Sequence, residues 1–323
     1  MSSNLNTINQ SGGAKFLGVL KKNISISAFI IIFVLFSASL GTKFLNLNNL
    51  QVVLEQSIVL LIVSFGLTFV IILGGIDLSV GSVLALAGVI AASVLKITNN
   101  TGLALTAGII TGALCGAFNG FVHTKLKIPS FIVTLGMLSI ARAVSIIYSK
   151  GSVVMIPFES TFKKIGLSPW IIFIGIFFFI IVFILHKFTI FGRYTRMIGG
   201  DENVAILCGI NVDKYKTLNF ILCGVLAGIG GILLAARIGA GSPASGQGFE
   251  LDAISAVVLG GTPLSGGIGG ITGTVIGVLI LSMLSNGLIL LGISTEVQML
   301  VKGLVLIIAV FISLERGKIG VIK

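Results

Sequence analysis

The stretch LGGIDLSVGS, residues 73–82, interrupts a long apolar region with three glycines, two serines and an aspartate. A second stretch, LGGTPLSGG at residues 259–267, repeats its pattern L-G-G-x-x-L-S-x-G. Backbone that leaves helical geometry inside a bilayer loses hydrogen bonds, and it persists only where protein or a water-filled cavity surrounds it. Paired interruptions in two parts of a chain are therefore the best sequence indication of a solute path through a membrane protein.

The composition assigns the chain to the membrane proteins. Of 323 residues, 55% are hydrophobic and only 10% are charged, whereas soluble domains carry roughly 25% charged residues. The net charge of +11 does not indicate nucleic acid, because Lys and Arg lie in short segments between apolar runs, as the positive-inside rule expects. The cysteines at 115, 208 and 223 have no metal-ligand spacing, so we expect no metal site.

We expect an all-α polytopic membrane protein with about ten transmembrane helices, a weak internal repeat and two Gly-rich broken segments. The apolar piece 251–262 is either a tenth span or a re-entrant half-helix, and the other nine spans are expected at 24–41, 52–75, 80–96, 102–123, 129–149, 168–187, 216–236, 267–291 and 296–313. Lys and Arg concentrate in the alternate segments that include the N-terminus, which favours cytoplasmic N- and C-termini. The expected division is a polar head 1–23, a transmembrane domain 24–313 and a tail 314–323.

Asp77 in the first broken segment has two interpretations. It hydrogen-bonds a polyol or moves as part of a gate, or it caps the helix that starts near Val80. Ser79 and Ser265, at matching places in the two motifs, are expected to satisfy backbone amides freed by the breaks. The repeat extends faintly to Asn-Gly pairs at Asn119 and Asn286.

Other polar residues lie in or beside apolar runs. Arg142 is deep in its expected span, where a charge either serves function or pairs with carbonyls or a carboxylate. Glu250 and Asp252 follow the loop that begins at Arg237, and they either suit a helix N-terminus or contact a solute-delivering partner outside. The run GGIGGITGTVIG at 266–277 predicts close helix packing rather than dinucleotide binding.

The loop 188–215 is the largest cytoplasmic connection. The sequence contains no pattern G-x-x-x-x-G-K-[ST], so an ATP-driven pump would need a separate ATPase. The stretch DENVAILCGI predicts a brief amphipathic helix ending at Gly209, with Asp201 as its cap and Glu202 in its first turn. This segment either docks an ATPase or is an ordinary connection.

Between about residues 46 and 313 the chain resembles the permease subunits of ABC-type simple-sugar importers, most closely those of bacterial ribose importers. The resemblance is carried by GGIDLSVGS, GRYTRMIGGDENVAILCGINVDK, GFELDAISAVVLGGTPLSGGIGG and NGLILLGISTEVQMLVKGLVLIIAV. It implies a bacterial inner-membrane protein that works as a homodimer, with a cytoplasmic ABC ATPase that uses ATP and Mg, and with an extracytoplasmic sugar-binding protein. No cofactor is expected in this chain.

The resemblance also implies roles for individual residues. It places the contact with the ATPase at Asp201, Glu202, Ala205 and Gly209, and it matches Arg142 to an arginine of the family. The predicted translocation pathway comprises Asp77, Ser79, Asn119, Arg142, Thr262, Ser265 and Asn286. The predicted contacts with the binding protein are Arg237, Glu250 and Asp252.

The predicted function is import of a monosaccharide, most simply ribose, by ATP-driven alternating access. Related permeases handle xylose, galactose or a furanosyl signalling molecule, so these solutes stay open. A secondary transporter driven by an ion gradient is the first rival class, and a passive channel or structural subunit is the second. We find no nucleophile–base set or metal cluster, so no catalytic residue is expected.

Overall fold

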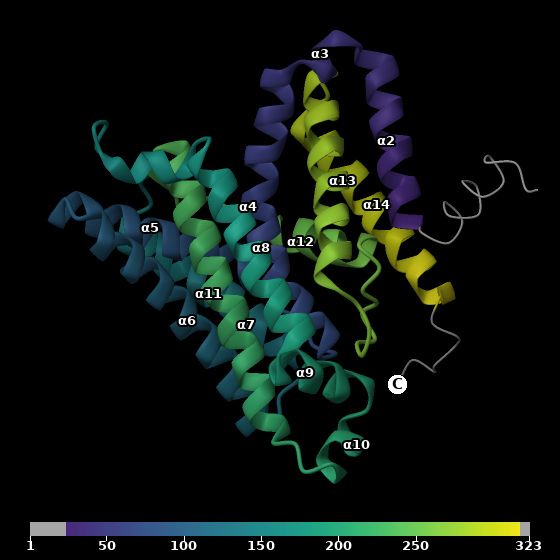
Figure 1. The fold of residues 1–323 in the computed structure, drawn as a ribbon. Helices are drawn as coiled ribbons and strands as arrows, with labels where there is room; N and C mark the ends of the chain where they lie inside the picture. The colour runs from purple at the N-terminus through teal and green to yellow at the C-terminus, as the bar shows by residue number, and fades with distance from the viewer. Residues whose placement is uncertain (1–23, 317–323) are drawn as a thin grey trace, which may run out of the picture.

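A computed structural model describes residues 24–316, and the expected head and most of the expected tail lie outside these residues. Helices dominate the described part of the chain (Figure 1). In chain order the elements are α2 (Ile24–Leu40), α3 (Thr42–Leu45), α4 (Leu47–Ile72), α5 (Val80–Thr98), α6 (Thr101–Lys125), α7 (Ser130–Ser149), β1 (Val154–Met155), the 3-10 helix η1 (Thr161–Gly166), α8 (Trp170–Phe188), α9 (Ile190–Gly200), α10 (Glu202–Leu207), α11 (Val212–Ile238), β2 (Ala240–Gly241), α12 (Phe249–Leu259), α13 (Ile271–Leu290) and α14 (Thr295–Arg316).

Seven helices among the described residues are long and apolar enough to cross a membrane, judged by length and composition: α4, α5, α6, α7, α8, α11 and α13. Each coincides with a span expected from the sequence. The all-α polytopic class is therefore confirmed.

The expected total of about ten spans is wrong for the described residues. The run 24–41 forms α2, whose 17 residues reach about 26 Å, less than the roughly 30 Å of a hydrocarbon core. The run 251–262 forms α12, whose 11 residues reach about 17 Å. Helix α14 is not among the seven and carries Glu296 and Lys302 in its first half. Apolar residue counts overestimated the spans because an apolar run does not fix the length of its helix: α12 ends at Leu259, and the chain turns at Gly261, whose φ is 92°.

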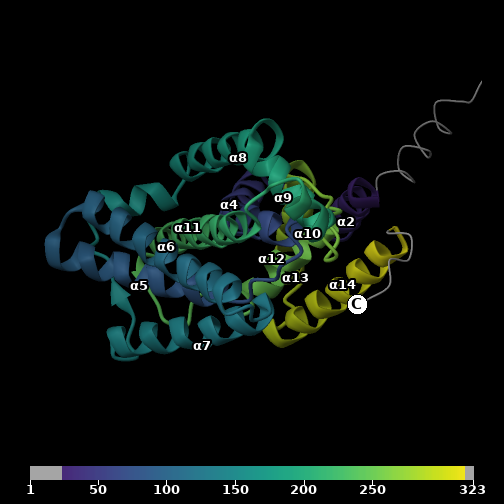
Figure 2. The same cartoon turned by 90° about the horizontal axis from the view of Figure 1, so that it is seen from below.

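Three helices form the interior of the bundle. The apolar windows of α4, α5 and α11 are 83%, 78% and 72% buried, whereas those of α6 and α8 are only 22% buried and that of α7 is 33% buried. Figure 2 shows α8 and α7 on opposite sides of α11 and α5. The peripheral helices consequently present apolar side chains to the surroundings, as a bilayer requires.

Close packing of α6 against α11 depends on glycine. Gly108, Gly112, Gly116 and Gly120 recur at every fourth position of α6 and so lie on one face. A Cβ at Gly112 would collide with the carbonyl oxygen of Gly224 in α11, and the reverse substitution would collide with Gly112. Small residues at such interfaces let two backbones approach closely.

The glycine-rich run 266–277 behaves similarly where it becomes helical. A Cβ at Gly273 would collide with the Gly260 carbonyl oxygen, and a Cβ at Gly277 with that of Ala256. The predicted close packing is thus confirmed, and it joins α13 to α12.

The two broken segments have the same orientation in the bundle. Helix α4 ends and α13 begins at the end of the bundle where α9 and α10 lie (Figure 1). The chain returns from β2 to that end through a loop, α12 and a second loop. Residues 239–270 therefore pass through the bundle without a spanning helix, and both motifs follow a helix that runs toward α10.

Candidate functional site

The first broken segment, residues 73–79, buries a polar cluster between α4 and α5. The Asp77 carboxylate accepts hydrogen bonds from the Ser79 amide (2.8 Å) and the Ser79 hydroxyl (2.6 Å). The Asn119 amide of α6 donates to the same hydroxyl at 3.0 Å. All three side chains are 1% exposed. Asp77 thus stabilises the turn that precedes α5, while the residue at the N-cap position of that helix is Ser79.

The irregular backbone of this segment obtains its hydrogen bonds from α7. The Ile76 amide donates to the Ser130 hydroxyl and the Leu78 amide to the Thr134 hydroxyl, each at 3.1 Å. Thr134 also donates to the Ile76 carbonyl at 3.2 Å. Sequence reasoning missed both residues, although two hydroxyl side chains four positions apart at the start of an apolar helix share a face. It had expected the Ser79 and Ser265 hydroxyls to accept freed amides, and neither does so among the described contacts.

The second broken segment, residues 260–270, contacts the first directly. The Gly267 amide donates to the Ile72 carbonyl at the end of α4, at 2.8 Å. A Cβ at Gly266 would lie 2.9 Å from the Cα of Gly74. Gly199 of α9 packs against the same place, because its Cβ would collide with the Ile72 carbonyl oxygen. We call this meeting of Gly74, Gly199, Gly266 and Gly267 around Ile72 the glycine junction.

Helix α10 lies beside the glycine junction at one end of the molecule (Figure 1). The predicted short helix is confirmed: Asp201 caps it by accepting the amides of Asn203 (2.9 Å) and Val204 (3.2 Å). The chain leaves it through Gly209, whose φ is 78°. Glu202 in the first turn pairs with Lys216 of α11 at 2.7 Å.

The residues of α10 differ in their exposure to solvent. Ala205 is fully buried and belongs to a small apolar cluster with Leu73, Ile198, Ile210 and Val212. Leu73 is the first residue of the first broken segment, so α10 and that segment share one apolar cluster. On the other face Val204, Ile206 and Leu207 are 50%, 55% and 86% exposed. Three exposed apolar side chains on so short a helix indicate an interaction site.

Arg142 of α7 holds the loop that precedes α12. Its guanidinium donates to the carbonyls of Pro243 and, at 2.7 Å, Ser245. Of the interpretations given for Arg142, pairing with backbone carbonyls therefore matches the contacts that it makes. Glu250, in the first turn of α12, lies close to Gly81, where a Cβ would collide with its carboxylate and with the Gly246 carbonyl oxygen.

Other predicted site residues lie apart from this centre. Asp252 of α12 pairs with Lys302 of α14 at 2.7 Å. Asn286 exchanges two amide hydrogen bonds with Asn49, at 3.0 and 2.9 Å, and has no contact with the Asn119 cluster. Arg237 ends α11 on the side opposite to α10.

In the second segment the structure separates the two predicted polar residues. Thr262 is fully buried, and its hydroxyl has no hydrogen-bond partner among the described residues, whereas Ser265 is exposed. The sequence also gave no indication of Glu55, a buried carboxylate in α4 that accepts from Gln51 (3.0 Å) and the Ser168 amide (3.3 Å).

Seven helices that are long and apolar enough to cross a membrane, with two interrupted segments in contact, are typical of a membrane transport protein. Residues 49–310 match the family described as branched-chain amino acid transport system / permease component, and the chain belongs to this family of permeases. It is 41% identical to the ribose import permease protein RbsC of Escherichia coli (strain K12), over 92% of this chain and 95% of that protein.

Two further relatives extend the comparison. Identity is 39% to the ribose import permease protein RbsC of Bacillus subtilis (strain 168), over 94% of this chain and 95% of that protein. It is also 39% to the L-arabinose transport system permease protein AraH of Escherichia coli (strain K12), over 85% of this chain and 84% of that protein. No solved structure matches the chain. The chain is accordingly a transport component and a multi-pass inner-membrane protein, and the resemblance found in its motifs is confirmed.

Proposed function

We propose that this chain is the permease subunit of an ATP-driven importer that carries ribose into the cytoplasm. The observation that carries the proposal is the near full-length similarity to ribose import permeases. The apolar cluster that the exposed helix α10 shares with the first of two broken membrane segments supports it independently.

Ribose is favoured over other solutes by the sequence identity. The L-arabinose permease of Escherichia coli is 39% identical to this chain, against 41% for the ribose permease of the same organism. The description of the family names branched-chain amino acids, but the relatives named above carry sugars. A pentose is therefore the substrate class that we propose, with ribose as the first member to test.

The proposed partners follow from the two ends of the molecule. A cytoplasmic ABC ATPase, which binds ATP and Mg, docks on Val204, Ile206 and Leu207 of α10. We further propose that the chain termini lie in the cytoplasm, as the distribution of Lys and Arg along the sequence favours. A sugar-binding protein contacts the opposite end near Arg237, and a second copy of this chain completes the pathway.

The proposed energy transfer starts at α10. Closure of the ATPase pair moves this helix, and the apolar cluster that contains Ala205 and Leu73 passes the movement to the first broken segment. The hydrogen bond from Gly267 to Ile72 passes it to the second segment. Both segments shift together, because their contacts are between glycine backbones, with no flexible side chain between them.

The proposed pathway comprises the polar residues of the two segments and their neighbours. Asp77, Ser79 and Asn119 satisfy one another in the observed arrangement. When the segments shift, these polar groups become available to sugar hydroxyls. Arg142 either keeps or breaks its hydrogen bonds to the loop before α12. Thr262, Ser265 and Asn286 are the remaining members of the proposed pathway.

The partner assignment is tested by purification of the tagged chain from gently solubilised native membranes, with copurifying proteins identified by mass spectrometry. We expect a stoichiometric ATPase with paired P-loops. Recovery of the chain alone in several mild detergents would remove the basis for ATPase docking, and ion-coupled uptake would then be the function to test.

Glu202→Lys tests the coupling role of α10. The substitution replaces the Glu202–Lys216 pair by two like charges. A surface pair of this kind contributes only about 0–1 kcal/mol to stability, so the protein should fold. We expect ATP hydrolysis by the complex to continue without sugar uptake, measured in proteoliposomes, and fully coupled uptake would reject the role.

A further inference from the structure

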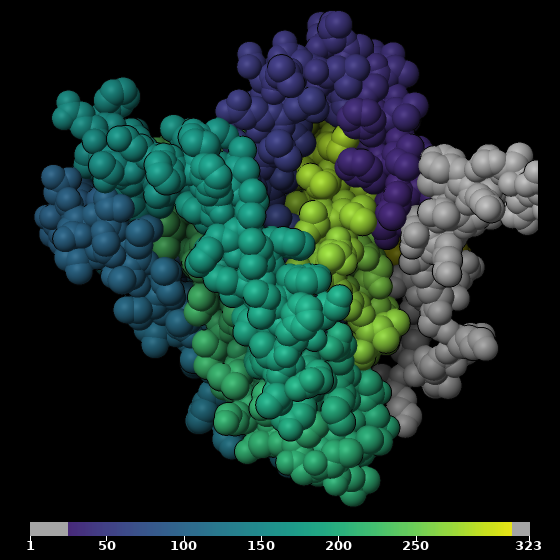
Figure 3. Space-filling model, in the orientation of Figure 1, coloured from purple at the N-terminus to yellow at the C-terminus, as the bar shows by residue number. Residues whose placement is uncertain are grey.

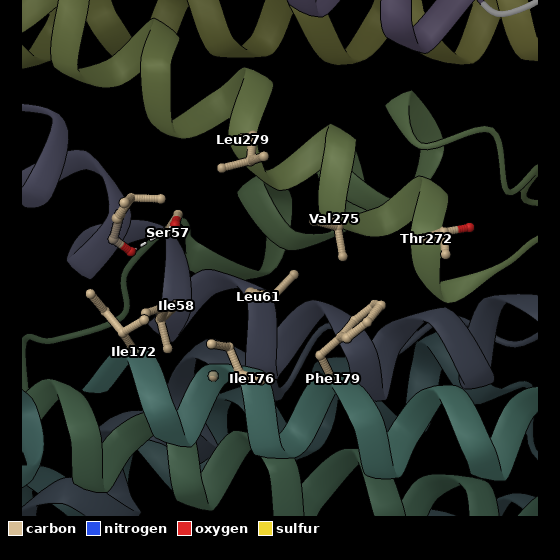
Figure 4. A pocket seen from close by; sticks show the side chains of 11 residues that line it. Ser57, Ile58, Leu61, Ile172, Ile176, Phe179, Thr272, Val275 and Leu279 are labelled. Carbon is tan, nitrogen blue, oxygen red and sulfur yellow. Dashed lines mark hydrogen bonds between the residues drawn. The ribbon is translucent and has the colours of Figure 1, made fainter. Parts of the chain in front are cut away.

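An apolar cavity lies between α8, α4 and α13 and is not part of the proposed sugar pathway. Its volume is about 380 Å³. Figure 4 shows side chains from all three helices pointing into it. The lining residues used below are Ser57, Leu61, Gly175, Phe179, Thr272 and Val275. We call this cavity the α4–α8–α13 groove.

The chemistry of the groove excludes a sugar. Only Ser57 and Thr272 bring hydroxyl groups to its wall, and the Ser57 hydroxyl already donates to the Leu54 carbonyl at 2.7 Å. A sugar in the groove would leave most of its own hydroxyls without partners, at about 1–3 kcal/mol for each buried group. An unbranched hydrocarbon chain has no such cost.

The groove opens on the outer surface of the bundle. All three helices are candidate membrane spans, and Ile176 on its wall is 51% exposed. The space-filling view shows the surface hollowed between α8 and α13 (Figure 3). Surrounding lipid can therefore enter the groove from the side.

A stripe on α8 leads from the groove to a cation. Phe179, Phe183 and Lys187 follow one another at intervals of four residues, which places them on one helical face. The rings of Phe179 and Phe183 are 5.8 Å apart, and the Lys187 ammonium lies 5.5 Å from the centre of the Phe183 ring. Lys187 is therefore about 12 Å beyond Phe179 along the helix.

The charge at this end of the groove is positive. Lys187 occupies the last turn of α8, and α9, which follows directly, carries Arg193 and Arg196. A chain that lay in the groove with its polar end toward Lys187 would bring that end to the Lys187 ammonium, at the junction with a helix that carries two further basic residues. This arrangement complements a phosphate-bearing headgroup.

We propose that the α4–α8–α13 groove is a binding site for an anionic phospholipid of the surrounding bilayer. One acyl chain occupies the groove, and the headgroup phosphate pairs with Lys187. The site rests on the fold alone and does not depend on which solute the permease carries.

Photolabelling of the full chain tests the proposal. The protein is reconstituted in phosphatidylcholine vesicles that contain phosphatidylglycerol with a diazirine on one acyl chain, and the labelled peptides are identified by mass spectrometry. We expect label concentrated in residues 172–179 and 272–279, and excess unlabelled phosphatidylglycerol should displace it. Labelling spread evenly over all bilayer-facing helices, without displacement, would overturn the site.

Two variants separate the acyl chain from the headgroup. Val275→Phe fills the groove and should remove the label, whereas Ile110→Phe adds similar bulk at an exposed position of α6 and should leave it unchanged. Lys187→Gln should reduce the preference for phosphatidylglycerol over a matched phosphatidylcholine probe about fivefold, the contribution of one basic residue at a membrane surface. An unchanged preference would reject the headgroup contact, and persistent labelling of folded Val275→Phe would reject the acyl-chain site. The competition measurement on the unsubstituted chain decides the proposal if Val275→Phe does not fold.

Discussion

At the scale of single residues, Thr134 of α7 stabilises the first broken segment through two hydrogen bonds. Its hydroxyl accepts the Leu78 amide and donates to the Ile76 carbonyl, so one side chain satisfies two backbone groups of the first broken segment. In a bilayer such groups have no water to replace a lost partner. The broken segment is therefore held in place by α7 as much as by its own sequence.

Thr134→Val preserves the shape of this side chain and removes its hydrogen bonds. We expect a loss of about 1–3 kcal/mol for each group left unsatisfied, seen as a lower thermal unfolding midpoint of the purified protein in detergent. Thr111→Val is the control, because Thr111 donates only to Ala107 within its own helix. Equal shifts in the two variants would contradict the bridging role of Thr134.

Leu207 is the residue at which ATPase docking is most directly tested. It is 86% exposed on α10, so it contributes little to the packing of this chain. We expect Leu207→Asp to lose copurification with the ATPase while unfolding at the unchanged temperature. Ile97→Asp, at a 79% exposed position that ends α5, should retain the partner. Loss of the ATPase from both variants, or from neither, would argue against a specific α10 surface.

At the scale of helices, glycine decides how closely elements approach. The α6–α11 contact places the backbone of Gly112 against that of Gly224, where any side chain would collide with a carbonyl oxygen. Backbone cannot move aside as a flexible side chain can. A larger side chain is therefore tolerated much less well at this interface than on the apolar surfaces of the same helices.

Gly112→Leu should prevent recovery of folded protein, measured as the monodisperse fraction in size-exclusion chromatography after detergent extraction. Gly136→Leu is the matched control, since a Cβ at Gly136 of α7 would meet nothing within 4 Å. We expect its yield to equal that of the unsubstituted chain. Normal recovery of folded Gly112→Leu protein would show that α6 and α11 can move apart without a large loss of stability.

The lengths of the apolar runs and the capping residues were sufficient to predict many of the helices. The seven spans and the short helix capped by Asp201 depend on local sequence, so they could be predicted. The count failed at α2 and α14, which are not among the seven, and 251–262 formed the shorter of the two alternatives left open for it, because an apolar run does not show how long its helix is. The sequence marked both broken motifs, but nothing in either motif showed that Gly74 and Gly266 would touch.

The same limit applies to the candidate site. Asp77, Ser79 and Asn119 were selected separately and do meet, whereas Asn286 bonds to Asn49 far from them. Pairings such as Asp252 with Lys302 and Arg142 with Ser245 join segments distant in sequence. Such contacts are decided by tertiary packing, which one sequence does not reveal.

At the scale of the whole molecule, the two ends of the bundle have different tasks in the proposed cycle. One end presents α10 on the glycine junction, and the other presents the ends of α5 and α11 with β1 and β2 (Figure 1). The inner helices α4, α5 and α11 connect these ends. A displacement at α10 can thus reach the pathway without unfolding the bundle.

The central claim is that ATP hydrolysis outside this chain drives sugar through it. The direct measurement is uptake of radiolabelled ribose into proteoliposomes that contain this chain, its copurifying ATPase and the sugar-binding protein. We predict uptake that requires ATP on the side of α10 and persists when proton and sodium gradients are collapsed. Uptake by this chain without ATP, or uptake abolished by loss of either gradient, would contradict the account.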